Sequence, residues 1–164
     1  MKIFVKNNYL FAKNQSFRCS VGHGGLSNNK IEGDRCTPVG KFKFDKIYYR
    51  ADKLGRIDFS ISSAEISKND GWCDDPSSKF YNQLVQFPFE SSAEKLYRED
   101  DLYDIICVIN YNTDPVIPGK GSAIFLHICK EDFAHTEGCI AVEKKVLLQI
   151  SKQIKKNSSI TIEN

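Results

Sequence analysis

The sequence lacks a marked excess of charge of either sign. Its 23 Lys and Arg residues stand against 21 Asp and Glu residues, and the formal net charge is +2. The lysines are scattered along the chain rather than gathered in one block. Proteins that bind nucleic acid concentrate basic residues on one face or in one run. The charge pattern therefore gives no support for a nucleic acid partner.

The sequence also lacks a long apolar run. The longest uncharged apolar stretch is near Ile105–Ile109, whereas a helix that spans a bilayer needs about 20 predominantly apolar residues. The N-terminal segment contains Lys6, Asn7 and Asn8 where a secretory signal needs an apolar core, so no such signal is recognisable. We expect no transmembrane segment. The pattern fits a cytoplasmic protein, the trimmed mature form of an exported one, or export by a route that the sequence does not reveal.

The cysteines lack the CxxC spacing that is typical of zinc ribbons and thioredoxin-like sites. Without a signal, reduced thiols are the default. In an exported chain, the six cysteines could form disulfides in several pairings. We expect at least one cysteine to be catalytic and most of the others to be small buried residues. The six are Cys19, Cys36, Cys73, Cys107, Cys129 and Cys139.

What the chain does contain is a series of short strand patterns. Runs with apolar alternation, separated by Gly, Asn, Asp or Pro, predict exposed or half-buried strands. These runs are Lys2–Val5, Phe17–Val21, Gly40–Phe44, Ile57–Ile61 and Ser159–Ile162. Near-continuous apolar runs at Asp104–Ile109 and Ala123–Ile128 predict central strands that are buried on both faces.

Helical patterns are fewer. An apolar stripe between Glu143 and Lys155, acidic at its start and basic at its end, predicts a helix. A shorter helix is predicted at Asp75–Gln83, and Ser91–Asp101 is either a helix or an acidic loop. No repeat, low-complexity tract or linker interrupts the 164 residues. We predict one β-rich α+β domain over residues 1–164, with mixed strands, few helices and a monomeric state.

The densest chemical signal is the segment HICKEDFAHTEGC, from His127 to Cys139. A free cysteine has a pKa of about 8.5, so little thiolate exists at neutral pH, and a nearby His can accept the proton and later pass it to a leaving amine. Gly138 permits a tight turn that leaves the N–H groups of Gly138 and Cys139 open to a substrate carbonyl. We therefore predict a Cys139–His127 dyad with an oxyanion hole.

Two other interpretations fit the same segment. Cysteine is commonly just a buried residue, and a sequence spacing does not establish a distance in space. The segment also reads H-x-C-x5-H-x3-C, and zinc accepts two His and two Cys ligands. Structural zinc sites favour tight CxxC-type turns, however, so we favour catalysis and expect no metal. The candidate zinc ligands would be His127, Cys129, His135 and Cys139.

Four blocks of the sequence resemble the L,D-transpeptidase catalytic domain family, the YkuD type, in the expected order. The segment TEGCI, preceded by His127, is similar to the family's Ser/Thr-x-Gly-Cys-hydrophobic signature. EGDRCTPVGKF resembles the EGDxxTPxGxF segment, and two further blocks resemble one branch of the family. The blocks cover Glu32–Phe42, Asp70–Val85, Gly119–His127 and Thr136–Ile140.

The resemblance implies a fold and a reaction. It implies that Cys139 is the nucleophile, that His127 is the base held by a backbone carbonyl, and that Gly138 supplies an oxyanion-hole N–H. The substrate would be the stem tetrapeptide of bacterial peptidoglycan, attacked at the meso-diaminopimelate carbonyl with release of D-alanine. An amine would resolve the thioester in a transpeptidase, and water would do so in an L,D-carboxypeptidase. No cofactor is required.

The resemblance also suggests substrate-binding residues. Thr136 would order the loop, Trp72 and Tyr81 lie in a block near the cleft, and Ser122 leads into the strand of His127. For Trp72 and Tyr81, anchoring an irregular loop to the core is an equal alternative. The chain departs from the family where Glu137 replaces the usual His and where Ala141 replaces the usual Arg or Asn.

Other functions remain open at this stage. On the same dyad, an amidase role related to toxins or phage is an alternative, and a non-catalytic wall-binding or zinc-binding module is an alternative from another class. The peptidoglycan substrate predicts a place in the cell envelope or periplasm, while the N-terminal segment leaves the cytoplasm open.

Overall fold

The computed structural model describes all residues from 1 to 164. Fourteen strands and two short helices are present, and none of the helices is long and apolar enough to cross a membrane. In chain order the elements are β1 (Lys2–Lys6), β2 (Tyr9–Ala12), β3 (Gln15–Ser20), β4 (Leu26–Ser27), β5 (Thr37–Pro38), β6 (Gly40–Tyr49), α1 (Ala51–Leu54), β7 (Ser63–Glu65), β8 (Asp70–Cys73), β9 (Leu84–Gln86), β10 (Ala93–Lys95), β11 (Ile105–Ile109), β12 (Phe125–Ile128), β13 (Ile140–Val142), α2 (Lys144–Ser151) and β14 (Ser159–Ile162).

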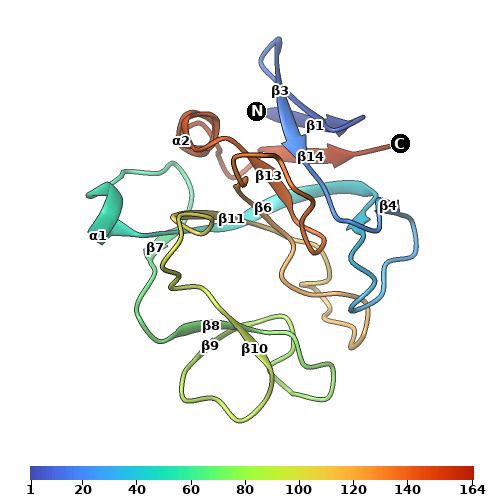
Figure 1. Ribbon diagram of the computed structural model, residues 1–164, viewed down its shortest axis with the longest axis vertical. Helices are drawn as coiled ribbons and strands as arrows, with labels where there is room; N and C mark the ends of the chain where they lie inside the picture. The colour runs from blue at the N-terminus through green and yellow to red at the C-terminus, as the bar shows by residue number, and fades with distance from the viewer.

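Nine of the strands form one sheet in the order β11-β12-β13-β3-β2-β1-β14-β6-β7 (Figure 1). The long strand β6 pairs with β14 through its first half and with β11 through its second half, and this closes the order into a ring. The first and last strands, β1 and β14, pair in parallel. The ring leaves few unpaired strand edges, which removes sites for pairing with other chains.

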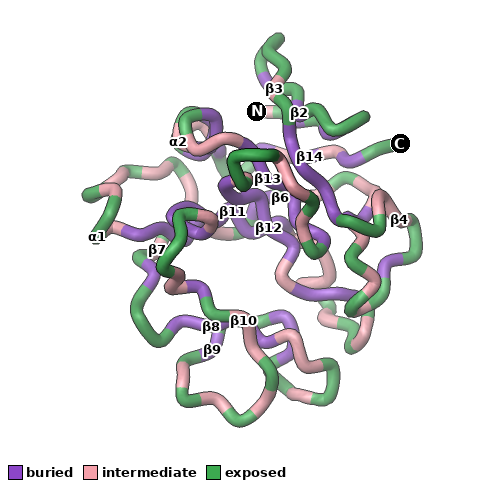
Figure 2. The backbone as a smooth tube through the Cα atoms, viewed as in Figure 1, coloured by how far each residue is buried: buried purple, intermediate pink, exposed green.

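The main core fills the inside of this sheet. It contains 23 buried hydrophobic residues, and the purple segments of Figure 2 trace them through the central strands. Val146, Leu147 and Ile150 on one face of α2 complete the core against β11 and β12. The fold is therefore β-rich with few helices, as the sequence predicted.

A second, smaller core lies beneath the predicted site. Nine buried hydrophobic residues form it, among them Trp72, Tyr103, Phe125 and Cys139. It connects the main sheet to a three-stranded sheet in the order β10-β8-β9, which lies at the lower end of the molecule in Figure 1. Glu94 of β10 and Arg98 of the loop after it line the pocket from this side.

The predictions of individual elements were confirmed in part. The strand predicted at Ser159–Ile162 coincides with β14, and the helix predicted over Glu143–Lys155 is present as the shorter α2. The strand predicted at Ile57–Ile61 is wrong, because β7 takes the place beside β6 and the segment only packs against the core. The hairpin strand β2 was not predicted.

The helix predicted at Asp75–Gln83 is also wrong. The Asp75 carboxylate accepts hydrogen bonds from the Ser77 N–H at 2.9 Å and from the Ser77 hydroxyl at 2.7 Å. Such a side-chain bond offers the backbone an alternative to the first helical turn, so the segment is a series of turns. For Ser91–Asp101 the sequence allowed a helix or an acidic loop; the segment contains no helix, and the short strand β10 is followed by bends.

Candidate active site

Strand alternation places His127 and Cys139 on the same face of the sheet. Strands β12 and β13 run parallel, with Leu126 opposite Ile140 and His127 opposite Ala141. Because successive side chains in a strand point to opposite faces, Leu126 and Ile140 enter the main core while His127 and Ala141 face the pocket. Cys139 precedes β13 and lies on the pocket face with them.

The turn before Cys139 depends on Gly138. Its φ is +138°, and a Cβ at this position would lie 2.9 Å from the Cys36 carbonyl oxygen. The Thr136 hydroxyl donates to the Cys139 carbonyl oxygen at 2.6 Å and accepts the Gly138 N–H at 3.2 Å. The Gly138 N–H is thus partly engaged, whereas the Cys139 N–H makes no hydrogen bond within the protein. The turn offers one free donor toward the pocket.

The thiol of Cys139 is held by the start of β12 rather than by His127. It donates to the Ala123 carbonyl oxygen at 3.1 Å and accepts the Phe125 N–H at 3.4 Å. Ala123 has a φ of +52°, a conformation that non-glycine residues rarely adopt. This residue delays the start of the predicted strand, so that β12 begins at Phe125, and its carbonyl oxygen accepts the thiol hydrogen.

Asn82 is the residue that holds Ala123. Its side-chain oxygen accepts the Ala123 N–H at 3.0 Å and the Trp72 indole N–H at 2.9 Å. Its amide nitrogen donates to the backbone carbonyls of Tyr111 and Asn112. The four bonds use the whole hydrogen-bonding capacity of a buried amide. Asn82 therefore fixes the carbonyl that receives the Cys139 S–H.

Trp72 and Tyr81, predicted from the sequence to bind substrate, lie behind the pocket wall and not in it. The Trp72 ring packs edge-on against Phe125, and the Tyr81 hydroxyl donates to Glu32 and accepts the Gly121 N–H. The interpretation of these two residues as loop anchors, left open by the sequence, agrees with this placement. Both side chains thus anchor loops next to the pocket.

His127 is buried and held in one tautomer. Its Nδ1 lies 2.8 Å from the Ile128 carbonyl oxygen. Since a carbonyl oxygen can only accept, Nδ1 carries a hydrogen and Nε2 is left as the acceptor. The edge of the imidazole meets the Tyr103 ring, with 5.2 Å between the ring centroids. Burial lowers the pKa of His127 to about 4, so the ring is neutral at pH 7.

Burial also determines the state of Cys139. Burial, with a smaller contribution from the negative charge of Glu94, raises the pKa of the thiol to about 12. No hydrogen bond joins the thiol to His127, and both groups are neutral at pH 7. Proton transfer between them in the resting protein would cost on the order of 10 kcal/mol before their mutual attraction is counted. The transfer must therefore accompany bond formation to a substrate.

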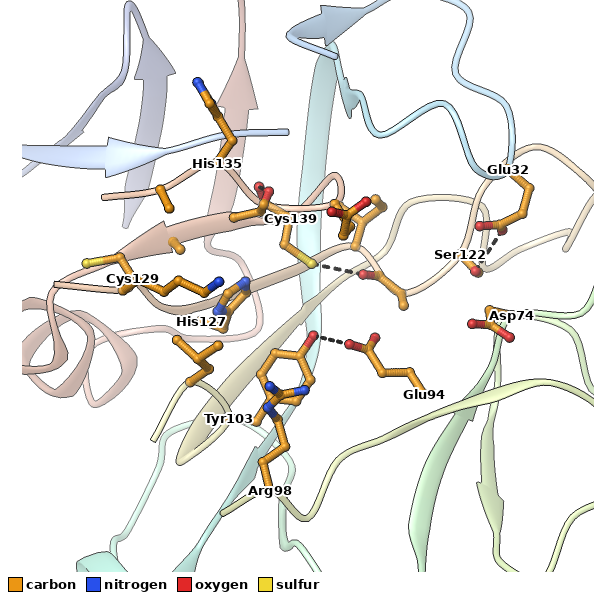
Figure 3. Close-up of a pocket in the computed structure, with 18 residues that line it drawn as sticks. Glu32, Asp74, Glu94, Arg98, Tyr103, Ser122, His127, Cys129, His135 and Cys139 are labelled. Atoms are coloured by element: carbon orange, nitrogen blue, oxygen red, sulfur yellow. Dashed lines mark hydrogen bonds between the residues drawn. The ribbon is translucent and has the colours of Figure 1, made fainter. Parts of the chain in front are cut away.

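A pocket of about 520 Å³ opens over Cys139 and His127 (Figure 3). Of the predicted site residues, Ser122 and Thr136 line it together with the dyad, and the Ser122 hydroxyl donates to Glu32 at 2.7 Å. Glu137 lies at the rim and forms a bidentate pair with Arg35, at 2.7 and 2.8 Å. The pocket also contains residues that the sequence analysis missed, chiefly Glu94, Arg98 and Tyr103.

The structure gives the zinc interpretation no support. No three His, Cys, Asp or Glu side chains are grouped so that they could hold a metal ion. His135 lies against His23 instead, with 5.6 Å between the ring centroids. Cys129, which is half-buried, is bonded through its N–H to the Val142 carbonyl oxygen.

A buried thiol, a neutral imidazole held by a backbone carbonyl and an unpaired N–H lie at one pocket, and these are groups that cysteine-dependent acyl transfer requires. Comparison with known families points to the same class. The chain matches the family described as the L,D-transpeptidase catalytic domain over residues 2–162. It therefore belongs to the L,D-transpeptidase catalytic domain family.

Comparison with single proteins adds less. A comparison with curated protein sequences finds no match. Among solved structures, the chain is similar to the helical cell shape determining protein Pgp2 from Campylobacter jejuni, with a TM-score of 0.49 and 14% sequence identity. The match covers 99% of this chain and 47% of that one, so the chain spans about half the length of Pgp2.

Proposed function

We propose that the protein is a cysteine-dependent L,D-transpeptidase that acts on peptidoglycan stem tetrapeptides. The observation that carries the proposal is the joint position of the Cys139 thiol, the His127 imidazole and the free Cys139 N–H in one pocket. Membership of the family supports the proposed substrate class. The placement of the three groups supports the roles proposed for them.

The first half-reaction forms a thioester. The Cys139 S–H turns from the Ala123 carbonyl toward Nε2 of His127, and the sulfur attacks the carbonyl carbon between the L-centre of meso-diaminopimelate and D-alanine. The proton moves to Nε2 as the S–C bond forms, and the Cys139 N–H donates to the developing oxyanion. The imidazolium then gives its proton to the nitrogen of D-alanine as the C–N bond breaks.

The second half-reaction releases the acyl group. An amine from a second stem attacks the thioester carbonyl, the C–N bond forms, the C–S bond breaks and the amine proton passes through His127 to the sulfur. Water in the place of the amine would give the tripeptide. The Ile128 carbonyl keeps Nδ1 protonated throughout, so that Nε2 is the nitrogen left to exchange the proton in both steps.

The test is mass spectrometry of the protein incubated with a disaccharide-tetrapeptide, with and without an added amine donor. We expect release of D-alanine and formation of a crosslinked or amine-exchanged product, and neither with Cys139→Ala. A free tripeptide as the sole product would show a carboxypeptidase instead. An untouched tetrapeptide would contradict the proposal.

A further inference from the structure

The carboxylate of Glu94 lies on the side of the Cys139 thiol opposite His127. The Tyr103 side chain lies between Glu94 and His127: its ring meets the His127 ring, and its hydroxyl donates to Glu94 Oε1 at 2.6 Å. Figure 3 shows Glu94 pointing into the pocket on one side of the Cys139 sulfur and His127 on the other. This arrangement could not be predicted from the sequence, because Glu94 lies on β10 and Tyr103 lies just before β11, and tertiary packing brings them together.

The Glu94 carboxylate forms no direct salt bridge, although the charge of Arg98 acts on it. The guanidinium of Arg98, which lines the same pocket, is engaged by Asp100 through two bonds of 2.8 and 2.6 Å. Burial raises the pKa of Glu94, and the hydrogen bond from Tyr103 and the charge of Arg98 offset this only in part. The charge of Glu94 also acts on the nucleophile, since it raises the pKa of the Cys139 thiol. A carboxylate of this kind is stabilised by a cation supplied by a ligand.

The positions that the reaction requires for the leaving amine and the acyl residue indicate which part of the donor would lie near Glu94. The leaving amine must lie near His127, which protonates it. The acyl residue, including its side chain, extends to the other side of the sulfur, where Glu94 lies. On this side Asp74 also lines the pocket, and its Oδ1 is buried without a hydrogen-bond partner.

We propose that Glu94, held by Tyr103, binds the protonated amino group on the side chain of the acyl residue, and so selects a diamino acid at that position. The inference rests on the proposed function, and it names the group that recognises the donor. The ammonium would also neutralise the charge that opposes ionisation of Cys139. Binding of the correct donor would thus make the thiol easier to deprotonate, and a stem without the amino group would lack this effect.

The test compares two tetrapeptide stems that differ only in acetylation of the side-chain amino group of the acyl residue. For the unchanged protein we expect kcat/KM for D-alanine release to fall on the order of 10- to 100-fold with the acetylated stem, the usual effect of losing a hydrogen bond to a charged group. In Glu94→Gln, which keeps an acceptor for Tyr103, the two stems should react at similar rates. Glu99→Gln, an exposed neighbour that lines no pocket, should keep the full preference.

Binding of the two stems to Cys139→Ala, measured by calorimetry, separates the inference from the proposed function. A preference for the free amine that vanishes in the Cys139→Ala, Glu94→Gln double variant supports the role of Glu94, whether or not the unchanged protein releases D-alanine. Release of D-alanine with an equal preference in the unchanged protein and Glu94→Gln would overturn the inference and leave the proposed function standing. Equal binding of both stems to Cys139→Ala would also overturn it.

Discussion

The thiol of Cys139 donates to the Ala123 carbonyl, and the imidazole of His127 donates through Nδ1 to the Ile128 carbonyl. Each reacting group is therefore held by a backbone carbonyl of its own, and the two are not bonded to each other. Their pKa values, about 12 for the thiol and about 4 for the imidazole, keep both neutral near pH 7.

Removal of the Glu94 charge should make the thiol more reactive. Because that charge raises the pKa of Cys139, Glu94→Gln should lower it and increase the alkylation rate at a given pH, by about tenfold for each pKa unit while little thiolate is present. The rate of iodoacetamide modification at Cys139, followed by peptide mass mapping from pH 7 to 10, measures this. The profile should move to lower pH in Glu94→Gln and stay in place in Glu99→Gln; an unmoved profile in Glu94→Gln would refute the electrostatic coupling.

Loss of the Asn82 side chain should disturb both stability and catalysis. Asn82→Ala leaves the Trp72 indole N–H and the Ala123 N–H without their acceptor, which should cost about 2–4 kcal/mol in the free energy of unfolding. Ala123 would also lose the bond that holds its strained backbone beside the thiol, so D-alanine release should fall. Urea denaturation and a D-alanine assay measure the two effects. Asn29→Ala, at an exposed position, is the control, and equal stability of the two variants would contradict the role of Asn82.

At the scale of the elements, the strands that carry the predicted dyad could be found from sequence. The apolar run before His127 and the Gly-Cys turn are local patterns, and strand alternation then brings both side chains to one face. The residues that the sequence analysis missed reach the site through long-range packing. Glu94 lies in a charged segment that resembles an exposed surface, and only the pairing of β10 with β8 carries it into the pocket.

Local competition explains the elements that were predicted wrongly. The turn-forming Asp75 carboxylate replaces the predicted helix, and no neighbouring strand is free to pair with Ile57–Ile61. Ala123 was included in a strand because its neighbours are apolar, but its left-handed backbone prevents the strand from starting there, and β12 begins at Phe125. A single sequence shows the propensities of these segments but not the tertiary bonds of Asn82 that override them.

The turn between Thr136 and Cys139 should tolerate no side chain at Gly138. A Cβ in Gly138→Ala would lie 2.9 Å from the Cys36 carbonyl oxygen, at a φ of +138°. We expect loss of about 1–3 kcal/mol in stability and a large loss of D-alanine release, because relief of the contact displaces the Cys139 N–H. Gly33→Ala is the matched control, since Gly33 has a φ of +77° but open space around its Cβ position. Full activity in Gly138→Ala would show that the free N–H is not used.

At the scale of the whole molecule, the neutral buried His127 makes stability depend on pH. The pKa of His127 falls from 6.5 to about 4 on folding, so between these values the unfolded chain binds a proton that the folded protein does not. The free energy of unfolding therefore keeps its full value above pH 6.5 and decreases as the pH falls toward 4, by on the order of 3 kcal/mol in all. Denaturant unfolding of the protein and of His127→Gln from pH 4 to 8 measures it. The variant should show a flatter pH dependence, and parallel curves would contradict the buried neutral state.

The most direct test of the proposed function is the mass of the intact protein after brief incubation with a tetrapeptide stem and an acid quench. A thioester on Cys139 predicts an added mass equal to that of the stem minus D-alanine, located by digestion to the peptide that contains Cys139, with a matching amount of free D-alanine. The adduct and the D-alanine should both be absent in Cys139→Ala. An adduct on another residue, or D-alanine release that survives in Cys139→Ala, would contradict the account.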